Sequence, residues 1–317
     1  MAIIILARDI ISLKPISYLQ SSWSSTITFM VLCGIMVGIR FLNKLVSKLR
    51  IGADDWWVLS AYIFFLAQEG LQVKALQIAI SQDGLPIGEF NHYLYISPIF
   101  YAPTNTCLRI GILFYYRSIF AVPRFYRLAM IVVICCAIWF VPAFLVEIFT
   151  CYPLAWAWDT NVHGKCINYV LFYVIMVSVE VALDAVVLAL PIREIVRLQM
   201  PRRRKILVSL IFLLGGFVIL TGIIRIVETY TRSHNGLDVG VDMVWYNIHV
   251  GTAFFCACAP TYMPLISRFK EISSSLWSSI VSETLSETAS SQTGSHGQQI
   301  SLKYFSSSSV VTSTNTI

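Results

Sequence analysis

Long apolar runs alternate with short polar connections along most of the chain. Each run has about 20 or more residues with few charges, which is the length a helix needs to cross the hydrocarbon core of a bilayer. Strands of a membrane barrel would be shorter and would alternate between apolar and polar side chains. The pattern therefore predicts an all-α bundle of seven transmembrane helices, over residues 22–42, 55–77, 94–116, 128–150, 168–191, 206–229 and 244–266.

The two ends of the chain have different patterns from this transmembrane domain, which we place at residues 22–268. Residues 1–21 lack the basic stretch of a signal peptide and are expected to form an external N-terminal segment. Residues 269–286 carry apolar side chains at helical spacing among polar ones, which predicts a short amphipathic helix on the cytoplasmic membrane surface. Residues 287–317 are rich in Ser and Thr and are predicted to be disordered. Their hydroxyl groups either only keep the tail hydrated, or they are phosphorylated and so recruit or release a partner.

The composition strengthens the membrane interpretation. Hydrophobic residues make up 57% of the 317 residues, charged residues make up only 13%, and the mean hydropathy is +0.72. A soluble domain usually has about 25% charged residues. This surplus of apolar side chains excludes a soluble globular protein and makes the lipid bilayer the expected partner.

Lys and Arg residues are distributed unequally between the two sides of the predicted bundle. Fifteen follow the first, third, fifth and seventh apolar segments, and four lie on the other side. The fifteen are Arg40, Lys44, Lys48, Arg50, Arg117, Arg124, Arg127, Arg193, Arg197, Arg202, Arg203, Arg204, Lys205, Arg268 and Lys270. Basic loops remain in the cytoplasm, so we predict an external N-terminus and a cytoplasmic C-terminus, and we expect the plasma membrane.

The basic run "PRRRK" at 201–205 has two interpretations. Such a run can bind nucleic acid, but orientation in the bilayer and contact with anionic lipid headgroups explain its position better. We therefore expect no nucleic-acid partner.

The loop "CYPLAWAWDTNVHGKC" lies on the predicted external side. Cys151 and Cys166 are the two cysteines outside the apolar segments, and the external compartment oxidises thiols. We therefore predict a Cys151–Cys166 disulfide. Trp156 and Trp158 either anchor the loop in the membrane interface or form a lid over a ligand pocket.

Charged side chains within the predicted helices are costly in lipid and therefore informative. Arg109 and Asp184 have matching predicted depths and opposite charges, so we predict that they form an ion pair. Glu69, Lys74, Glu180 and His249, together with Trp156 and Trp158, are candidates for a polar ligand pocket open to the outside. The alternative is a structural ion-pair network that fixes the order of the helices.

Asp54 and Asp55 open the second predicted helix. Carboxylates at this position cap unpaired backbone N–H groups and face the positive end of the helix dipole. The alternative is a salt bridge to the region of Arg117.

The sequence lacks the motifs of several chemistries. Retinal attachment requires a lysine in the seventh helix, and residues 244–266 contain none. The chain also has no HExxH, GxSxG or glycine-rich phosphate loop, and it has too few intramembrane histidines for a zinc hydrolase. We therefore expect no cofactor, no metal ion and no enzymatic activity.

Five sequence blocks occur in order over residues 25–268: "ADDWWVLSA", "LRIGILFYYRSIF", "CYPLAWAWD" with "GKC", "LDAVVLALPIREIVRLQMPRRRKILVSLIFLLGG" and "CACAPTYMPL". Together they resemble the fungal rhodopsin-like integral membrane family, which includes appressorium-type receptor-like proteins and members from secondary-metabolite clusters such as the satratoxin cluster. The resemblance implies seven helices and an external Cys–Cys loop, but no settled activity. The chain departs from the family pattern at Lys74, where His is usual, and at His249, where Glu is frequent.

The sequence supports two functions. One is a receptor-like protein that senses an external small molecule and signals through its basic inner loops to a cytoplasmic partner. The other is an accessory membrane protein of a secondary-metabolite biosynthetic cluster, which handles a metabolite or anchors an enzyme.

Overall fold

The computed structural model describes residues 16–80, 87–119, 122–159, 162–192, 202–232, 242–259 and 261–262. They belong to one compact unit, Met1–Leu265. The predicted amphipathic helix at 269–286 and the predicted disordered tail at 287–317 lie outside the described residues, as does most of the N-terminal segment.

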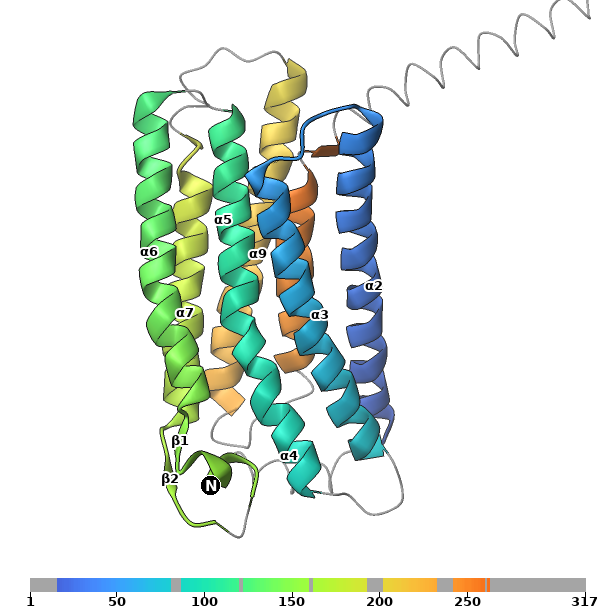
Figure 1. The fold of residues 1–317 in the computed structure, drawn as a ribbon, viewed down its shortest axis with the longest axis vertical. Coiled ribbons are helices and arrows are strands. Elements are labelled where there is room, and N and C mark those ends of the chain that lie inside the picture. Colours follow the sequence, from blue (N-terminus) through green and yellow to red (C-terminus); the bar gives the residue numbers. More distant parts are fainter. Residues whose placement is uncertain are drawn as a thin grey trace, which may run out of the picture. The chain divides into compact units, whose positions relative to one another are not determined.

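Helices dominate the described part of the chain (Figure 1). They are α2 (Ile16–Val46), α3 (Ala53–Ile80), α4 (Ile87–Ile96), α5 (Tyr101–Ile119), α6 (Pro123–Ile148), α7 (Tyr169–Ala189), α9 (Arg202–Arg232) and a helix over 242–259. The long helices lie side by side, and successive ones run in opposite directions (Figure 1). The predicted all-α bundle of membrane-spanning helices is confirmed.

Two predicted boundaries differ from the structure. α2 begins at Ile16 and ends at Val46, so it takes in part of the predicted N-terminal segment and, at its other end, Lys44. The predicted helix over 94–116 is divided into α4, a 3₁₀ turn at Ser97–Phe100 (η1) and α5. Pro98 stands at the start of η1, and proline is tolerated at the first turn of a helix because its missing N–H has no partner there.

Among the described helices, five are long and apolar enough to cross a membrane. They cover Ser22–Val46, Ala53–Ile80, Pro123–Ile148, Tyr169–Ala189 and Phe212–Thr231. α5 and the helix over 242–259 also belong to the bundle, but they carry buried polar side chains such as Asn105, Arg109 and Asn247. These two helices line the polar interior of the bundle and are therefore less apolar in composition.

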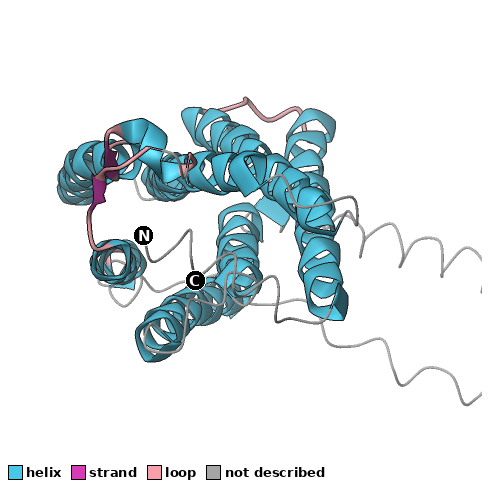
Figure 2. Ribbon diagram, turned by 90° about the horizontal axis from the view of Figure 1, so that it is seen from below, coloured by secondary structure: helices cyan, strands magenta, loops and turns pink. Residues whose placement is uncertain are grey.

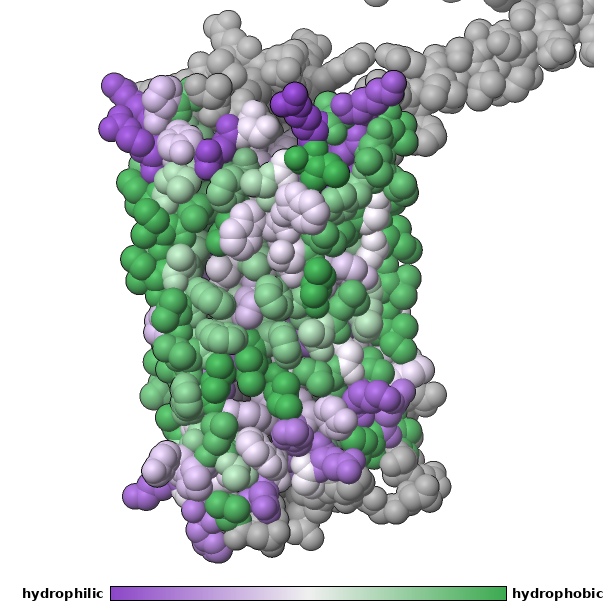
Figure 3. Space-filling model, in the orientation of Figure 1, coloured by the Kyte–Doolittle hydropathy of each residue, from purple (hydrophilic) through white to green (hydrophobic). Residues whose placement is uncertain are grey.

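The distribution of apolar side chains is that of a protein surrounded by lipid. Large apolar residues such as Val31, Ile131 and Leu213 are 56%, 56% and 71% exposed. In Figure 3, hydrophobic side chains cover the middle of the visible face, and hydrophilic ones gather at both ends. Phe65, Leu108 and Phe254 form part of a buried apolar core between α3, α5 and the helix over 242–259.

The two ends of the bundle are distinct. We call the end with the α2–α3 turn, residues 47–52, the basic end. The opposite end, which we call the loop end, carries a two-stranded antiparallel hairpin, β1 (Cys151–Tyr152) and β2 (Lys165–Cys166), with a 3₁₀ turn at Leu154–Ala157 (η2) between the strands. Figure 2 shows this hairpin over one side of the group of helices.

The hairpin contains the predicted disulfide. Cys151 lies opposite Cys166 in the strand register, and their sulfur atoms are bonded. The half-buried Trp158 packs against α4, with its ring centroid 5.1 Å from that of His92 and 5.4 Å from that of Tyr95. The loop is therefore held both by a covalent bond and by aromatic contacts with the neighbouring helix.

Replacing Cys166 by serine should lower the free energy of unfolding by about 3 kcal/mol, because opening the disulfide releases a loop of about 15 residues in the unfolded chain. Unfolding by SDS in mixed micelles measures the change. The control is Cys135→Ser, which alters an exposed thiol on α6 and should change the stability by less than about 0.5 kcal/mol. Equal effects of the two substitutions would contradict a stabilising disulfide.

Candidate functional site

A buried arginine joins α5 to α7. Arg109 Nε donates to Asp184 Oδ1 at 2.6 Å, and Nη2 lies 3.3 Å from Glu180 Oε2. Glu180 and Asp184 are four residues apart on α7 and therefore lie on the same helix face. Arg109 is 4% exposed and Glu180 is 2% exposed. The structure thus brings Arg109 and Asp184 into contact, with Glu180 as a second carboxylate partner.

A second buried arginine lies among tyrosines. The guanidinium of Arg225 on α9 lies 5.3 Å, 5.5 Å and 5.3 Å from the ring centroids of Tyr101, Tyr173 and Tyr246. Its Nη1 donates to the Tyr101 hydroxyl at 3.2 Å, and its Nη2 donates to the Tyr173 hydroxyl. The carboxylate of Asp242 also approaches the guanidinium, with Oδ1 3.7 Å from Nε. The tyrosine hydroxyl oxygens thus lie closer to this cation than the carboxylate does, and the ring faces add cation–π attraction.

Tyr101 connects the two arginines. Its hydroxyl accepts a hydrogen bond from Arg225 and lies near the Glu180 carboxylate, which faces Arg109. Neighbouring charged and polar groups therefore lead from Asp242, whose side chain is 32% exposed, to Asp184. We call this set the polar network, and its members are Asp242, Arg225, Tyr101, Glu180, Arg109 and Asp184.

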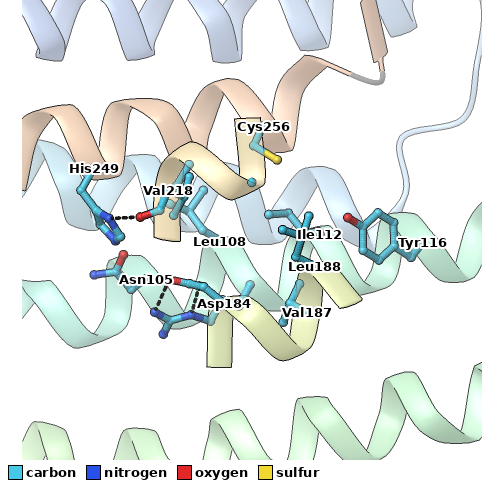
Figure 4. A pocket seen from close by; sticks show the side chains of 13 residues that line it. Asn105, Leu108, Ile112, Tyr116, Asp184, Val187, Leu188, Val218, His249 and Cys256 are labelled. Atoms are coloured by element: carbon cyan, nitrogen blue, oxygen red, sulfur yellow. Dashed lines mark hydrogen bonds and ion pairs between the residues drawn. The ribbon is translucent and has the colours of Figure 1, made fainter. Parts of the chain in front are cut away.

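The inner end of the polar network borders a small cavity (Figure 4). The cavity has a volume of about 40 Å³ and is lined by α5, α7, α9 and the helix over 242–259. Arg109, Asp184 and His249 contribute polar groups, and Cys256 lies on its wall. A space of this size holds a few water molecules but not a drug-sized ligand.

His249 is the predicted pocket residue that lines this cavity. Its Nδ1 lies 3.1 Å from Thr221 Oγ1 and 3.2 Å from the Val218 carbonyl oxygen, and the ring is 2% exposed. Figure 4 shows the ring turned toward Val218 on α9. His249 thus ties the helix over 242–259 to α9.

The other predicted pocket residues are dispersed. Glu69 is fully buried on α3, where both of its oxygens lie 3.1 Å from the Asn247 amide nitrogen in the orientation that satisfies both groups. Lys74, on the same helix, is exposed, whereas Trp156 and Trp158 are half-buried in the loop-end hairpin. Glu180 lies in the polar network. The structure therefore does not gather these six residues into a single cavity.

A cluster of four charges ties α2 to α3 at the basic end. Asp55 accepts hydrogen bonds from Arg40 Nε at 2.8 Å and from Lys44 Nζ at 2.5 Å. Asp54 also contacts both cations. Arg40 further donates to the Ala257 carbonyl at 2.7 Å, so the helix over 242–259 joins the cluster. We call Arg40, Lys44, Asp54 and Asp55 the charge cluster.

This cluster changes the interpretation of the two aspartates. Asp55 accepts from the Gly52 backbone N–H at 2.8 Å, which is half of a capping box, so the predicted cap is present. In the structure the two carboxylates contact Arg40 and Lys44 of α2. Arg117 packs over the Phe114 and Tyr126 rings, at 4.9 and 4.2 Å.

The packing around His249 makes a clear prediction for two glycines of α9. A Cβ at Gly222 would lie 2.4 Å from Val181 Cγ2, whereas a Cβ at Gly216 would meet nothing within 4 Å. Gly222→Ala should therefore destabilise the protein by about 1–3 kcal/mol through overpacking. Gly216→Ala should leave stability unchanged or raise it, because alanine favours the helix. The same SDS unfolding measurement compares them, and equal shifts would contradict close α7–α9 packing.

A model of the fungal rhodopsin domain matches residues 39–268, which is most of the described bundle. The chain belongs to the fungal rhodopsin domain family. This membership confirms the resemblance found in the sequence blocks. The matched range, residues 39–268, includes both arginines of the polar network and all four residues of the charge cluster.

Curated relatives of this fungal rhodopsin domain are membrane and gene-cluster proteins. A SAT4 family membrane protein of Emericella nidulans is 34% identical over 178 residues, covering 55% of this chain and 44% of the relative. The Satratoxin biosynthesis SC1 cluster protein 4 of Stachybotrys chartarum is 28% identical over 181 residues, covering 56% and 66%. The chain thus spans about two fifths to two thirds of the length of these relatives. No solved structure matches it.

Proposed function

We propose that this fungal rhodopsin domain is a receptor-like membrane protein that senses an external small molecule and is not an enzyme. The observation that carries the proposal is the polar network, which joins the loop end to the interior through buried, paired charges. A ligand that alters the contact at Asp242 would change the hydrogen bonds of Arg225, Tyr101 and Glu180 in turn. Glu180 and Asp184 are already engaged by Arg109, which suits a switching element better than catalytic groups.

The proposed orientation places the loop end outside and the basic end in the cytoplasm of the plasma membrane. The unequal distribution of Lys and Arg supports it, and so does the disulfide, because disulfides form in oxidising compartments. A cytoplasmic signalling partner would then meet the basic end. A reporter fused after Ile317 should read as cytoplasmic, and an external reading would contradict this orientation.

The proposal assigns the ligand to the loop end and not to the cavity. The cavity of about 40 Å³ is too small for an organic ligand, so it serves as the space into which the network rearranges. The loop-end hairpin with Trp156 and Trp158 would border the entrance. The proposal includes no retinal, since residues 242–259 contain no lysine.

Cys256 provides a readout for this function because it lies on the cavity wall and is 8% exposed. Purified protein in lipid nanodiscs is treated with N-ethylmaleimide, with and without an organic extract of the producing organism's culture medium. Mass spectrometry follows labelling of Cys256, with the exposed Cys135 as an internal reference. We expect the extract to change the labelling rate of Cys256 but not that of Cys135. An unchanged rate with every extract fraction would contradict a receptor.

A second candidate function rests on the relatives. One of them carries the name of satratoxin biosynthesis and another that of phomoidride biosynthesis. An accessory role in a biosynthetic pathway, in handling a metabolite or holding an enzyme at the membrane, would fit such names. Biosynthetic genes beside the gene for this chain, together with loss of their product on its deletion, would favour that role over sensing.

A further inference from the structure

Arg225 is a buried cation, and the described residues use only part of its hydrogen-bonding capacity. We propose that Arg225 anchors the carboxylate of an external organic acid, which enters from the loop end and takes the place of Asp242. This inference rests on the proposed sensing function and names the chemical class of its ligand.

The donors of Arg225 supply the first argument. A guanidinium has five N–H donors, and the tyrosine hydroxyls take one from Nη1 and one from Nη2. Nε is buried and has no hydrogen-bond acceptor among the described residues. A carboxylate approaching Nε would form the charge-assisted contact that the structure leaves unmade.

The position of Asp242 supplies the second argument. Its Oδ1 lies 3.7 Å from Arg225 Nε, which is beyond hydrogen-bond distance, and its side chain is 32% exposed while that of Arg225 is 2% exposed. Asp242 also accepts from the Tyr173 hydroxyl at 2.7 Å. Asp242 is thus held by Tyr173 and not by a hydrogen bond from Arg225 Nε, and it is the more exposed of the two charged groups, so a ligand carboxylate can displace it toward solvent.

The surrounding rings decide the sign of the ligand charge. Tyr101, Tyr173 and Tyr246 form an aromatic cage, a kind of site that binds organic cations, but Arg225 already occupies it. A cationic ligand would be repelled by the guanidinium at this point. An acid is attracted to it, and its apolar body would pack against the tyrosine rings.

The contact through Tyr101 explains how such binding reaches the interior. The hydroxyl that accepts from Arg225 also lies near the carboxylate of Glu180, the second partner of Arg109. Any shift of the guanidinium toward a ligand carboxylate loosens its bond to Tyr101 and changes the balance of Glu180 between Tyr101 and Arg109. The acid site and the cavity at Asp184 are therefore linked by consecutive contacts.

The test compares three probes of one size on the full-length protein in phosphatidylcholine nanodiscs. Hexanoate is the acid, hexanamide its neutral counterpart and hexylammonium the cation, and calorimetry measures their binding. We expect hexanoate to bind at least about tenfold more tightly than hexanamide, as a charge-assisted hydrogen bond provides. Equal binding of hexanoate and hexanamide, or preferential binding of hexylammonium, overturns the proposal.

Two variants separate recognition from a purely structural role. Arg225→Met should reduce hexanoate affinity to that of hexanamide. Asp242→Asn should strengthen hexanoate binding severalfold, because it removes the internal competitor, whereas a structural ion pair would give weaker or unchanged binding. Glu89→Gln, which removes an exposed carboxylate at the same end of the bundle, is the control and should have no effect. If Arg225→Met fails to fold, Asp242→Asn still decides the outcome.

Labelling of Cys256 keeps this inference distinct from the proposed function. If hexanoate binds and depends on Arg225, but no extract fraction alters Cys256 labelling, the acid site stands and the sensing function fails. If extract fractions alter Cys256 labelling but hexanoate does not bind, the sensing function stands and the acid site is overturned.

Discussion

Replacing Arg109 by methionine should lower the free energy of unfolding by about 3–5 kcal/mol. The substitution leaves Glu180 and Asp184 without the cation that both of them face, and Glu180 is 2% exposed. Transferring unpaired carboxylates out of water is costly, and the packing of a methionine of similar length does not offset it. Unfolding by SDS in mixed micelles measures the loss.

The partners of Arg109 supply the control and the rescue. Arg124→Met changes an exposed arginine at the start of α6 and should cost less than about 0.5 kcal/mol. Adding Glu180→Gln and Asp184→Asn to Arg109→Met removes the stranded charges and should restore much of the loss, since buried ion pairs can often be replaced by neutral groups without loss of stability. If adding Glu180→Gln and Asp184→Asn lowers the stability of Arg109→Met further, by as much as these two changes do in the wild-type protein, Arg109 does not neutralise the two carboxylates.

Replacing Asp55 by asparagine should cost a similar amount, about 3–5 kcal/mol. Asp55 is fully buried and accepts hydrogen bonds from Arg40, Lys44 and the Gly52 backbone. Losing its charge leaves the charge cluster with two cations and only one carboxylate, Asp54. The measurement is again the free energy of unfolding in mixed micelles.

A double substitution distinguishes this charge balance from simple loss of a helix cap. Arg40→Met with Asp55→Asn leaves Lys44 paired with Asp54 and should be more stable than the sum of the two single effects predicts. Glu89→Gln, in the first turn of α4, is the matched change of an exposed carboxylate and should be nearly neutral. Strictly additive single effects would show that Arg40 and Asp55 do not act together.

The helices were predictable from sequence because lipid imposes both a minimum length and an apolar exterior. The disulfide was predictable because Cys151 and Cys166 were the two cysteines outside the apolar runs. Lys44 was expected in the loop after the first helix, since that helix was predicted to end at residue 42, and Arg40 was counted with the basic residues of that loop. α2 extends to Val46, and its buried arginine is neutralised by aspartates at the start of the next helix. Hydropathy along one helix does not show that its buried charge is neutralised by charges on another helix.

The candidate site was predictable only in part, for a geometric reason. Matching depth in the membrane and opposite charge sufficed to pair Arg109 with Asp184. Glu180 joins this pair because it shares one face of α7 with Asp184. Depth alone grouped Lys74 with Glu69, but five residues along a helix correspond to a rotation of roughly 140°. Lys74 is exposed, and Glu69 is buried. The tyrosines around Arg225 come from separate helices, and no spacing within one helix could reveal their meeting.

The coupling energy between Asp242 and Asp184, the two ends of the polar network, tests the proposed switch most directly. The free energy of unfolding is measured for Asp242→Asn, Asp184→Asn and the double variant, with Glu89→Gln combined with Asp184→Asn as the control pair. Groups within one connected network show interaction energies of about 0.5–3 kcal/mol, whereas distant independent sites add within about 0.5 kcal/mol. We predict a coupling above this limit for Asp242 with Asp184 and none for the control pair. Additive effects in both pairs would contradict a network that connects the loop end to the interior.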